Sequence, residues 1–166
     1  TAEIINMSGQ FLMPGFIDSH THALDGGASL LRANVYDSIY TITDLAAFAL
    51  QSKKDGSGMI NDFLVIDGIN ISTWSNITTI QKIFNENDFA AIPVVLRGSD
   101  GHTEWVNNIV LQKAGINKNF ITQLDADAKK FYGFDESNEP NGFIADDGFE
   151  QVDKIMPEEK IDWMKS

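Results

Sequence analysis

Two of the chain's three histidines lie two residues apart, in the segment 14–22, which reads PGFIDSHTH. If this segment is a β-strand, His20 and His22 point to the same face, because side chains alternate along a strand. Two imidazoles on one face can bind one divalent ion, and a catalytic zinc site keeps a further position open for water. The spacing therefore predicts a metal-ligand pair. The alternative is that both histidines are polar residues on an exposed strand end.

Asp18 precedes His20 by two residues and so lies on the same side of the predicted strand. A carboxylate there can accept a hydrogen bond from the ring nitrogen of His20 that does not face the metal, which fixes the orientation of the ring. Asp18 is therefore predicted to orient the ligand. It could equally cap a neighbouring loop.

The segments 9–22, 99–108 (SDGHTEWVNN) and 139–144 (EPNGFI) follow one another in an order that matches a known protein group. The first resembles the first barrel strand of the metal-dependent amidohydrolase superfamily, in its amidohydrolase-3 group, which includes proteins of the exoenzyme-regulatory type. The second resembles that group's aspartate-glycine-histidine, tryptophan-valine-asparagine segment. The third looks like its glutamate-proline-x-glycine turn before a helix.

This resemblance implies a (β/α)8 metal-dependent hydrolase barrel that carries the family's α/β insertion. It implies a divalent metal, with zinc expected, as one or two ions held by His20, His22 and ligands on later strands. The implied reaction is hydrolysis of an amide or cyclic amide C–N bond in a small molecule by metal-activated water. The aspartate that transfers the proton is expected outside this chain.

In the family, the second segment folds over the barrel mouth, so the resemblance implies that His102, Trp105 and Asn107 contact the substrate. The alternative is a structural role, with His102 capping a helix and Trp105 in the core. If a helix begins at Thr103, its positive end disfavours a protonated His102.

A complete barrel needs about 250 residues, whereas the chain has 166 and its only other histidine is His102. We therefore interpret the chain as the truncated N-terminal part of a longer enzyme. Residues 1–60 would hold the first barrel strand and the units after it, 61–157 an insertion-like α/β region, and 158–166 a tail. Such a part is expected to be inactive and to bind metal loosely. Unpaired barrel edges would favour a homo-oligomer.

The net charge of −12 argues against nucleic acid and anionic membranes as partners, because both attract basic surfaces. A small-molecule substrate is the expected partner. The absence of cysteine excludes disulfides and thiol catalysis but leaves the cellular compartment open. A non-catalytic regulatory or ligand-binding module on the same fold is the alternative function.

Alternating strand and helix patterns predict an α/β fold with a largely parallel sheet. The predicted strands are 16–19, 34–39, 63–66 and 92–96, with Val35, Tyr36 and Ile39 in the core. A helix is predicted from Thr43 as N-cap to the basic residues before Gly56. The other predicted helices are 75–84, 103–114, 122–131 and 146–156, and residues 133–141 are predicted to form a polar loop.

Overall fold

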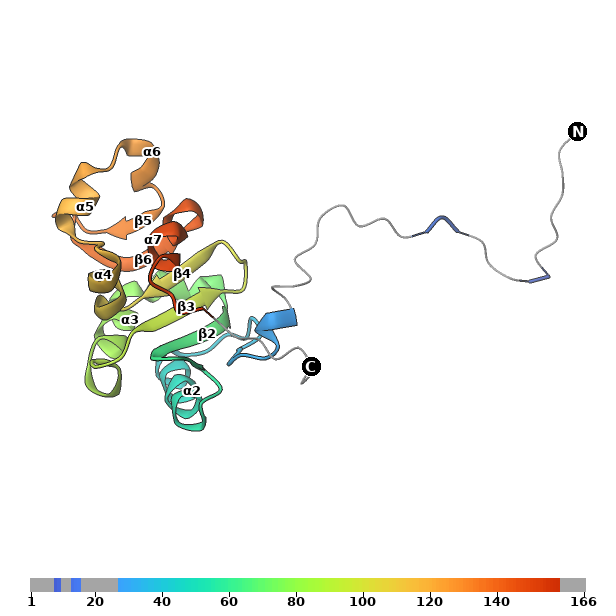
Figure 1. The fold of residues 1–166 in the computed structure, drawn as a ribbon. Coiled ribbons are helices and arrows are strands. Elements are labelled where there is room, and N and C mark those ends of the chain that lie inside the picture. Colours follow the sequence, from blue (N-terminus) through green and yellow to red (C-terminus); the bar gives the residue numbers. More distant parts are fainter. Residues whose placement is uncertain (1–7, 10–12, 16–26, 159–166) are drawn as a thin grey trace, which may run out of the picture.

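The computed structural model describes residues 8–9, 13–15 and 27–158. The predicted metal ligands His20 and His22, together with Asp18 and the predicted strand 16–19, lie outside these ranges. Within them, six strands form a single mixed sheet in the order β1-β2-β3-β4-β6-β5 (Figure 1). The strands are β1 (Met59–Ile60), β2 (Phe63–Ile69), β3 (Val94–Gly98), β4 (Thr103–Val106), β5 (Tyr132–Phe134) and β6 (Pro140–Ala145).

Helices cover both faces of this sheet. They are α2 (Ile42–Asp55), α3 (Ile77–Phe84), α4 (Asn108–Ala114), α5 (Lys118–Gln123), α6 (Ala126–Lys129) and α7 (Phe149–Asp153), with short 3₁₀ turns at Ile71–Asn76, Asn87–Phe89 and Asp146–Gly148. Among the described residues, no helix is both long and apolar enough to cross a membrane.

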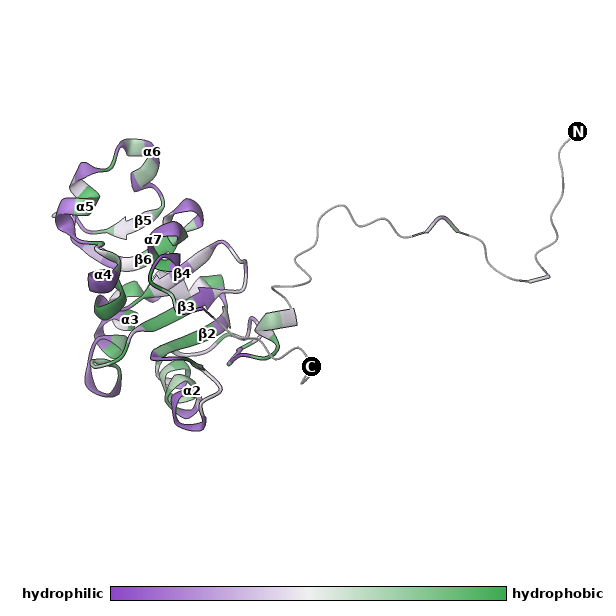
Figure 2. Cartoon of the chain, viewed as in Figure 1, coloured by the Kyte–Doolittle hydropathy of each residue, from purple (hydrophilic) through white to green (hydrophobic). Residues whose placement is uncertain are grey.

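Side-chain alternation along the central strands gives the protein two cores. In β2, Leu64 and Ile66 join the core under α2 and α3, whereas Phe63 and Val65 join the core on the opposite face. Both faces of a central strand are therefore buried, which explains why β2 and β3 are hydrophobic over most of their length (Figure 2). The predicted α/β class is confirmed in this form, as a sheet between two helical layers.

The prediction of a largely parallel sheet is wrong for the described residues. Among the six strands, only β2 and β3 pair in parallel, and the other four pairings are antiparallel. The reason lies in the connections. A parallel pair needs a long crossover, here supplied by α3, whereas β3 and β4 are joined by the short turn 99–102, which permits only antiparallel pairing.

The predicted helix 103–114 begins five residues later than expected. Thr103–Val106 is strand β4, and α4 starts only at Asn108, with Asn107 as its N-cap. The apolar residues Trp105 and Val106 fall on opposite faces of the sheet, one in each core, which is the period-2 pattern of a buried strand. His102 consequently precedes a strand, and the argument that a helix N-terminus disfavours its protonation does not apply.

The third family-like segment also differs from its prediction. Residues 132–145 form the antiparallel pair β5 and β6 in place of a polar loop and a turn before a helix. Gly142 has φ of +90°, and a Cβ there would lie 2.3 Å from the Val106 carbonyl oxygen and 2.6 Å from Trp105 Nε1. Glycine is required at this position because the start of β6 runs close beside the end of β4 in the sheet and leaves no room for a side chain. The predicted helix 146–156 is reduced to a 3₁₀ turn and the five residues of α7.

Residues 34–39 do not form the predicted strand. Asn34 makes one isolated bridge to Asp67, and the backbone then turns through positive φ at Tyr36 and Asp37. Val35 is buried as expected, but Tyr36 and Ile39 are 64% and 83% exposed. In a turn the side chains do not alternate between two faces as they do in a strand, so apolar residues there can face solvent.

The remaining helices were placed with smaller errors. Helix α2 begins after Thr41, whose hydroxyl accepts a hydrogen bond from the Asp44 amide, and so the N-cap lies two residues before the predicted one. Residues 71–84 split into a 3₁₀ turn and α3, and the predicted helix 122–131 corresponds to the end of α5 and the short α6.

Candidate functional site

A cavity of about 740 Å³ lies beside the carboxyl ends of β2 and β3 and the start of β4. In α/β proteins, ligands bind at this end of parallel strands. The wall is formed by the ends of these three strands, the turn after β3 and residues of α7. The titratable or charged residues of the lining include Asp67, Arg97, Asp100, His102, Glu104 and Asp153.

Three neighbouring strands each give this cavity a charged side chain. Asp67 ends the apolar run of β2, Arg97 follows the apolar run of β3, and Glu104 lies opposite Arg97 in β4. By alternation, all three lie on the face that carries Val65, Val95 and Val106. The sheet therefore presents a row of acid, base and acid to the cavity.

Asp67 holds two arginines next to the cavity. Its side chain is 7% exposed, and Arg32 Nη1 donates a hydrogen bond of 3.1 Å to Asp67 Oδ2. Arg97 Nη1 lies 3.8 Å from the other oxygen, Oδ1, which has no hydrogen-bond partner among the described residues. Asp67 thus keeps one acceptor available although it is buried.

Glu104 is the more unusual group, because it is only 5% exposed and its Oε1 has no hydrogen-bond partner within the described part of the chain. Burial raises the pKa of Glu104 to about 7, an increase that Arg97 opposes and Asp153 reinforces. A carboxyl group with such a pKa can exchange a proton near neutral pH. Groups of this kind are concentrated in binding and catalytic sites.

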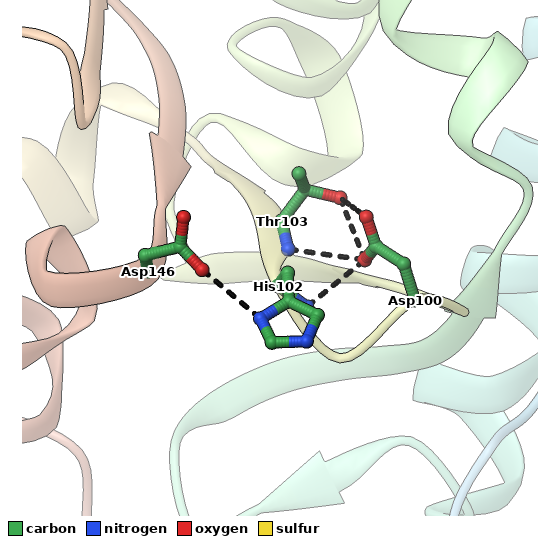
Figure 3. Close-up of polar contacts among 4 residues, drawn as sticks. All are labelled: Asp100, His102, Thr103 and Asp146. Atoms are coloured by element: carbon green, nitrogen blue, oxygen red, sulfur yellow. Dashed lines mark hydrogen bonds and ion pairs between the residues drawn. The ribbon is translucent and has the colours of Figure 1, made fainter.

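His102 is the last residue of the turn 99–102 that joins β3 to β4 (Figure 3). Its side chain is 70% exposed. Asp100 shapes this turn: its Oδ1 accepts hydrogen bonds of 3.0 Å from the amides of His102 and Thr103. His102 Nδ1 lies 3.0 Å from Asp146 Oδ1, a contact that holds the ring by one edge. Its Nε2 makes no hydrogen bond to a described residue and lies on a ring that lines the cavity.

Trp105 and Asn107 occupy the interior. Trp105 is fully buried, packs against Phe84 with ring centroids 6.0 Å apart, and donates through Nε1 to the Asn141 carbonyl oxygen. Asn107 is 1% exposed, and neither residue is part of the cavity lining. Of the three residues expected to contact substrate, the structure therefore places only His102 on the cavity wall. For Trp105 and Asn107, substrate contact stays a prediction.

A metal site cannot be assembled from the described residues. They contain no group of three or more histidine, aspartate, glutamate or cysteine side chains placed to hold an ion. His102 is paired with one carboxylate, and the carboxylates of the cavity are interspersed with arginines. The described residues do not fit a divalent ion, and the expected ligand pair lies outside them.

Asp67, Arg97 and Glu104 were not predicted as site residues from the sequence. A signal was present, because each is a charged residue beside two or more consecutive apolar residues of a buried strand, in FLVID, VVLR and TEWV. A charge at the end of such a strand lies at the edge of the sheet where ligands bind. Glu104 was hidden because its segment was assigned to a helix, in which it would have faced solvent.

Comparisons with known proteins relate the whole chain to a protein family. The sequence model described as "Amidohydrolase family" matches residues 3–165. The chain is 29% identical over 157 residues to the "Putative amidohydrolase YtcJ" of Bacillus subtilis, covering 93% of this chain and 28% of that protein. It is 25% identical over 164 residues to "Protein LONG AFTER FAR-RED 3" of Arabidopsis thaliana, covering 95% and 26%.

It is also 21% identical over 169 residues to the "Exoenzymes regulatory protein AepA" of Pectobacterium carotovorum, covering 90% and 32%. Among solved structures, an uncharacterized metal-dependent hydrolase from Pyrococcus furiosus superposes with a TM-score of 0.49 at 19% identity, covering 90% of this chain and 26% of that one. The chain spans about a quarter to a third of the length of the curated relatives it matches.

Proposed function

Because the chain belongs to the amidohydrolase family, we propose that it is the N-terminal part of a metal-dependent hydrolase that cleaves an amide or cyclic amide C–N bond of a small molecule. In this proposal residues 1–60 contain the first strand of a (β/α)8 barrel, and 61–157 form the family's insertion. The observation that carries the proposal is the cavity at the strand ends, where His102 and Glu104 line one wall.

In this proposal the metal ion is held by His20 and His22, together with ligands outside this chain. A divalent metal, zinc in our proposal, lowers the pKa of bound water and so supplies a hydroxide at neutral pH. The described residues contribute different functions. His102, held by Asp146, presents Nε2 for a hydrogen bond to a polar substrate group, and Glu104 can hold or release a proton at Oε1 near neutral pH.

The experiment that tests the metal site compares zinc binding by the chain with that by a His20→Ala/His22→Ala variant. We expect loose binding by the unaltered chain and at least about tenfold weaker binding by the variant, because both imidazole ligands are lost. Calorimetry and elemental analysis after dialysis provide the measurement.

His102→Ala is the matched control, since it removes the third histidine, which lies outside the proposed ligand pair. It should bind zinc like the unaltered chain. Equal affinities for all three proteins would show that the pair does not hold the ion in this chain, and the hydrolase proposal would lose its metal site.

A non-catalytic regulatory module is the second candidate. One observation favours it: the chain is similar to a protein named as an exoenzymes regulatory protein. Ligand binding without hydrolysis, with no retained metal, would support this candidate.

A further inference from the structure

The wall of the cavity is predominantly acidic. Its lining contains five carboxylates and two arginines, and one of these arginines, Arg32, is already paired with Asp67. Two of the carboxylates are committed to the protein itself, since Asp100 accepts hydrogen bonds within its own turn and Asp37 accepts one from Ser99. The acceptors left over belong to Asp67, Glu104 and Asp153.

Two of those acceptors are buried without a hydrogen-bond partner among the described residues. Asp67 Oδ1 and Glu104 Oε1 belong to side chains that are about nineteen-twentieths buried and face the cavity, and neither oxygen has a hydrogen-bond partner in the described part of the protein. A buried acceptor without a donor is unfavourable, so such atoms in a folded protein call for an explanation. A ligand that satisfies these two oxygen atoms must therefore bring an N–H or O–H donor.

Arg97 does not supply that donor. Its Nη1 stands 3.8 Å from Asp67 Oδ1, beyond hydrogen-bond distance, and the described residues offer the guanidinium no hydrogen bond. Arg97 lies between the two acidic side chains in the row across the sheet. It therefore limits the negative charge of the wall without satisfying either acceptor.

We propose that this cavity recognises a small molecule through a cationic amine or guanidinium group, which donates hydrogen bonds to Glu104 Oε1 and Asp67 Oδ1. The proposal deepens the proposed function and rests on it in one respect, because it assigns the substrate class of the hydrolase as compounds that carry such a group. A cation adds the missing donors and offsets the excess of carboxylates in one step.

Binding of this kind depends on pH through Glu104. The charged groups around Glu104 are Arg97 from β3, Asp153 from α7 and, beyond Arg97, Asp67 from β2; its neighbour on β6, Ile144, is apolar. Because the pKa of Glu104 is about 7, its carboxyl is mainly ionised at pH 8 and mainly protonated at pH 6. Cation affinity should therefore fall roughly tenfold from pH 8 to pH 6.

The test uses n-butylamine and methylguanidinium as cationic probes and acetate as an anionic probe, at constant ionic strength. Binding to the metal-free 166-residue chain is followed by NMR titration at pH 8 and pH 6. Saturable binding of a cationic probe with shifts at the cavity, and none of acetate, is expected. Glu104→Gln should weaken cation binding at least about tenfold at pH 8 and remove its pH dependence, since the amide keeps the shape but not the charge.

Two further variants keep the result specific. Asp127→Asn removes a carboxylate whose side chain is 98% exposed on α6, outside the cavity lining, and should bind like the unaltered chain. His102→Gln removes the histidine of the wall, so that the remaining pH dependence belongs to Glu104. Acetate binding in place of the cations, or cation binding that Glu104→Gln leaves unchanged, would overturn the proposal.

The readout is independent of hydrolysis. Cation binding by a chain that retains no zinc would support this inference while removing the metal site of the proposed function. Zinc retained on His20 and His22 with no cation binding would overturn this inference and leave the metal site of the proposed function in place.

Discussion

Asn107→Ala is expected to lower the free energy of unfolding by about 4 kcal/mol, because Asn107 connects four segments through one buried amide. Its Oδ1 accepts hydrogen bonds from the Val94 amide at 3.1 Å and from the Val110 amide at 3.3 Å. Its Nδ2 donates to the Ile92 carbonyl oxygen at 2.8 Å, with the carbonyl oxygens of Phe84 and Phe89 at 3.3 and 3.4 Å.

The size of this effect follows from what alanine leaves behind. Loss of an N-cap alone costs about 1 kcal/mol. Here the residue is 1% exposed, so water does not readily replace the amide, and a strand amide and a loop carbonyl lose their partners in the interior. Each such buried orphan costs about 1–3 kcal/mol. Denaturant unfolding followed by circular dichroism measures the difference.

Asn117→Ala is the matched control. Asn117 is also an N-cap, accepting from the Phe120 amide at 3.0 Å, but it is exposed at the start of α5. Its loss should cost only about 1 kcal/mol. Asn107→Asp adds a second test, since the carboxylate keeps the acceptor but loses the donors, and it should be nearly as damaging as alanine. Equal effects of the two alanine variants would show that the buried contacts of Asn107 contribute little.

Glu104→Gln is expected to stabilise the protein at pH 8 and to reduce its loss of stability with rising pH. The pKa of Glu104 is about 7 in the folded protein, raised by burial from 4.5. Between these values the folded state holds a proton that the unfolded state has released. Stability therefore falls as pH rises from about 4.5 through about 7 and levels off above it. From pH 5 to pH 8 this group should account for about 2–3 kcal/mol.

The measurement is the difference in unfolding free energy between the two proteins across that pH interval. Taking the difference removes the other titrating groups, which both proteins share. The stabilisation by glutamine should grow by about 2–3 kcal/mol from pH 5 to pH 8. Asp127→Asn, which alters an exposed carboxylate, should show no such growth. A constant difference across the interval would mean that Glu104 is ionised throughout and that its burial is compensated.

The sequence predicted the α/β class, the burial of the apolar strands and the family, because these depend on local hydrophobic runs and on three short segments that follow one another in the family's order. Strand direction was not predictable in the same way. Thr103–Val106 carries a helix-compatible sequence, and its strand state depends on pairing with β3 and β6, which are separate parts of the chain. Tertiary contacts of this kind override local preference.

The candidate site was predicted only in part for a related reason. His102 was identified because the aspartate-glycine-histidine segment is conspicuous by itself. Asp67, Arg97 and Glu104 form a row only because β2, β3 and β4 lie side by side in the fold. The residues between them in the sequence do not indicate which strands will be neighbours. The roles predicted for His20, His22 and Asp18 stay predictions.

The pleat of the sheet separates two tasks that share the same three strands. Asp67, Arg97 and Glu104 face the cavity, while their immediate neighbours Ile66, Leu96 and Trp105 are packed in the opposite core. A change of side chain on one surface leaves the packing partners of the other in place. A substitution at one of these three strand ends can therefore change the chemistry of the cavity wall while the core under α2 and α3 keeps its packing.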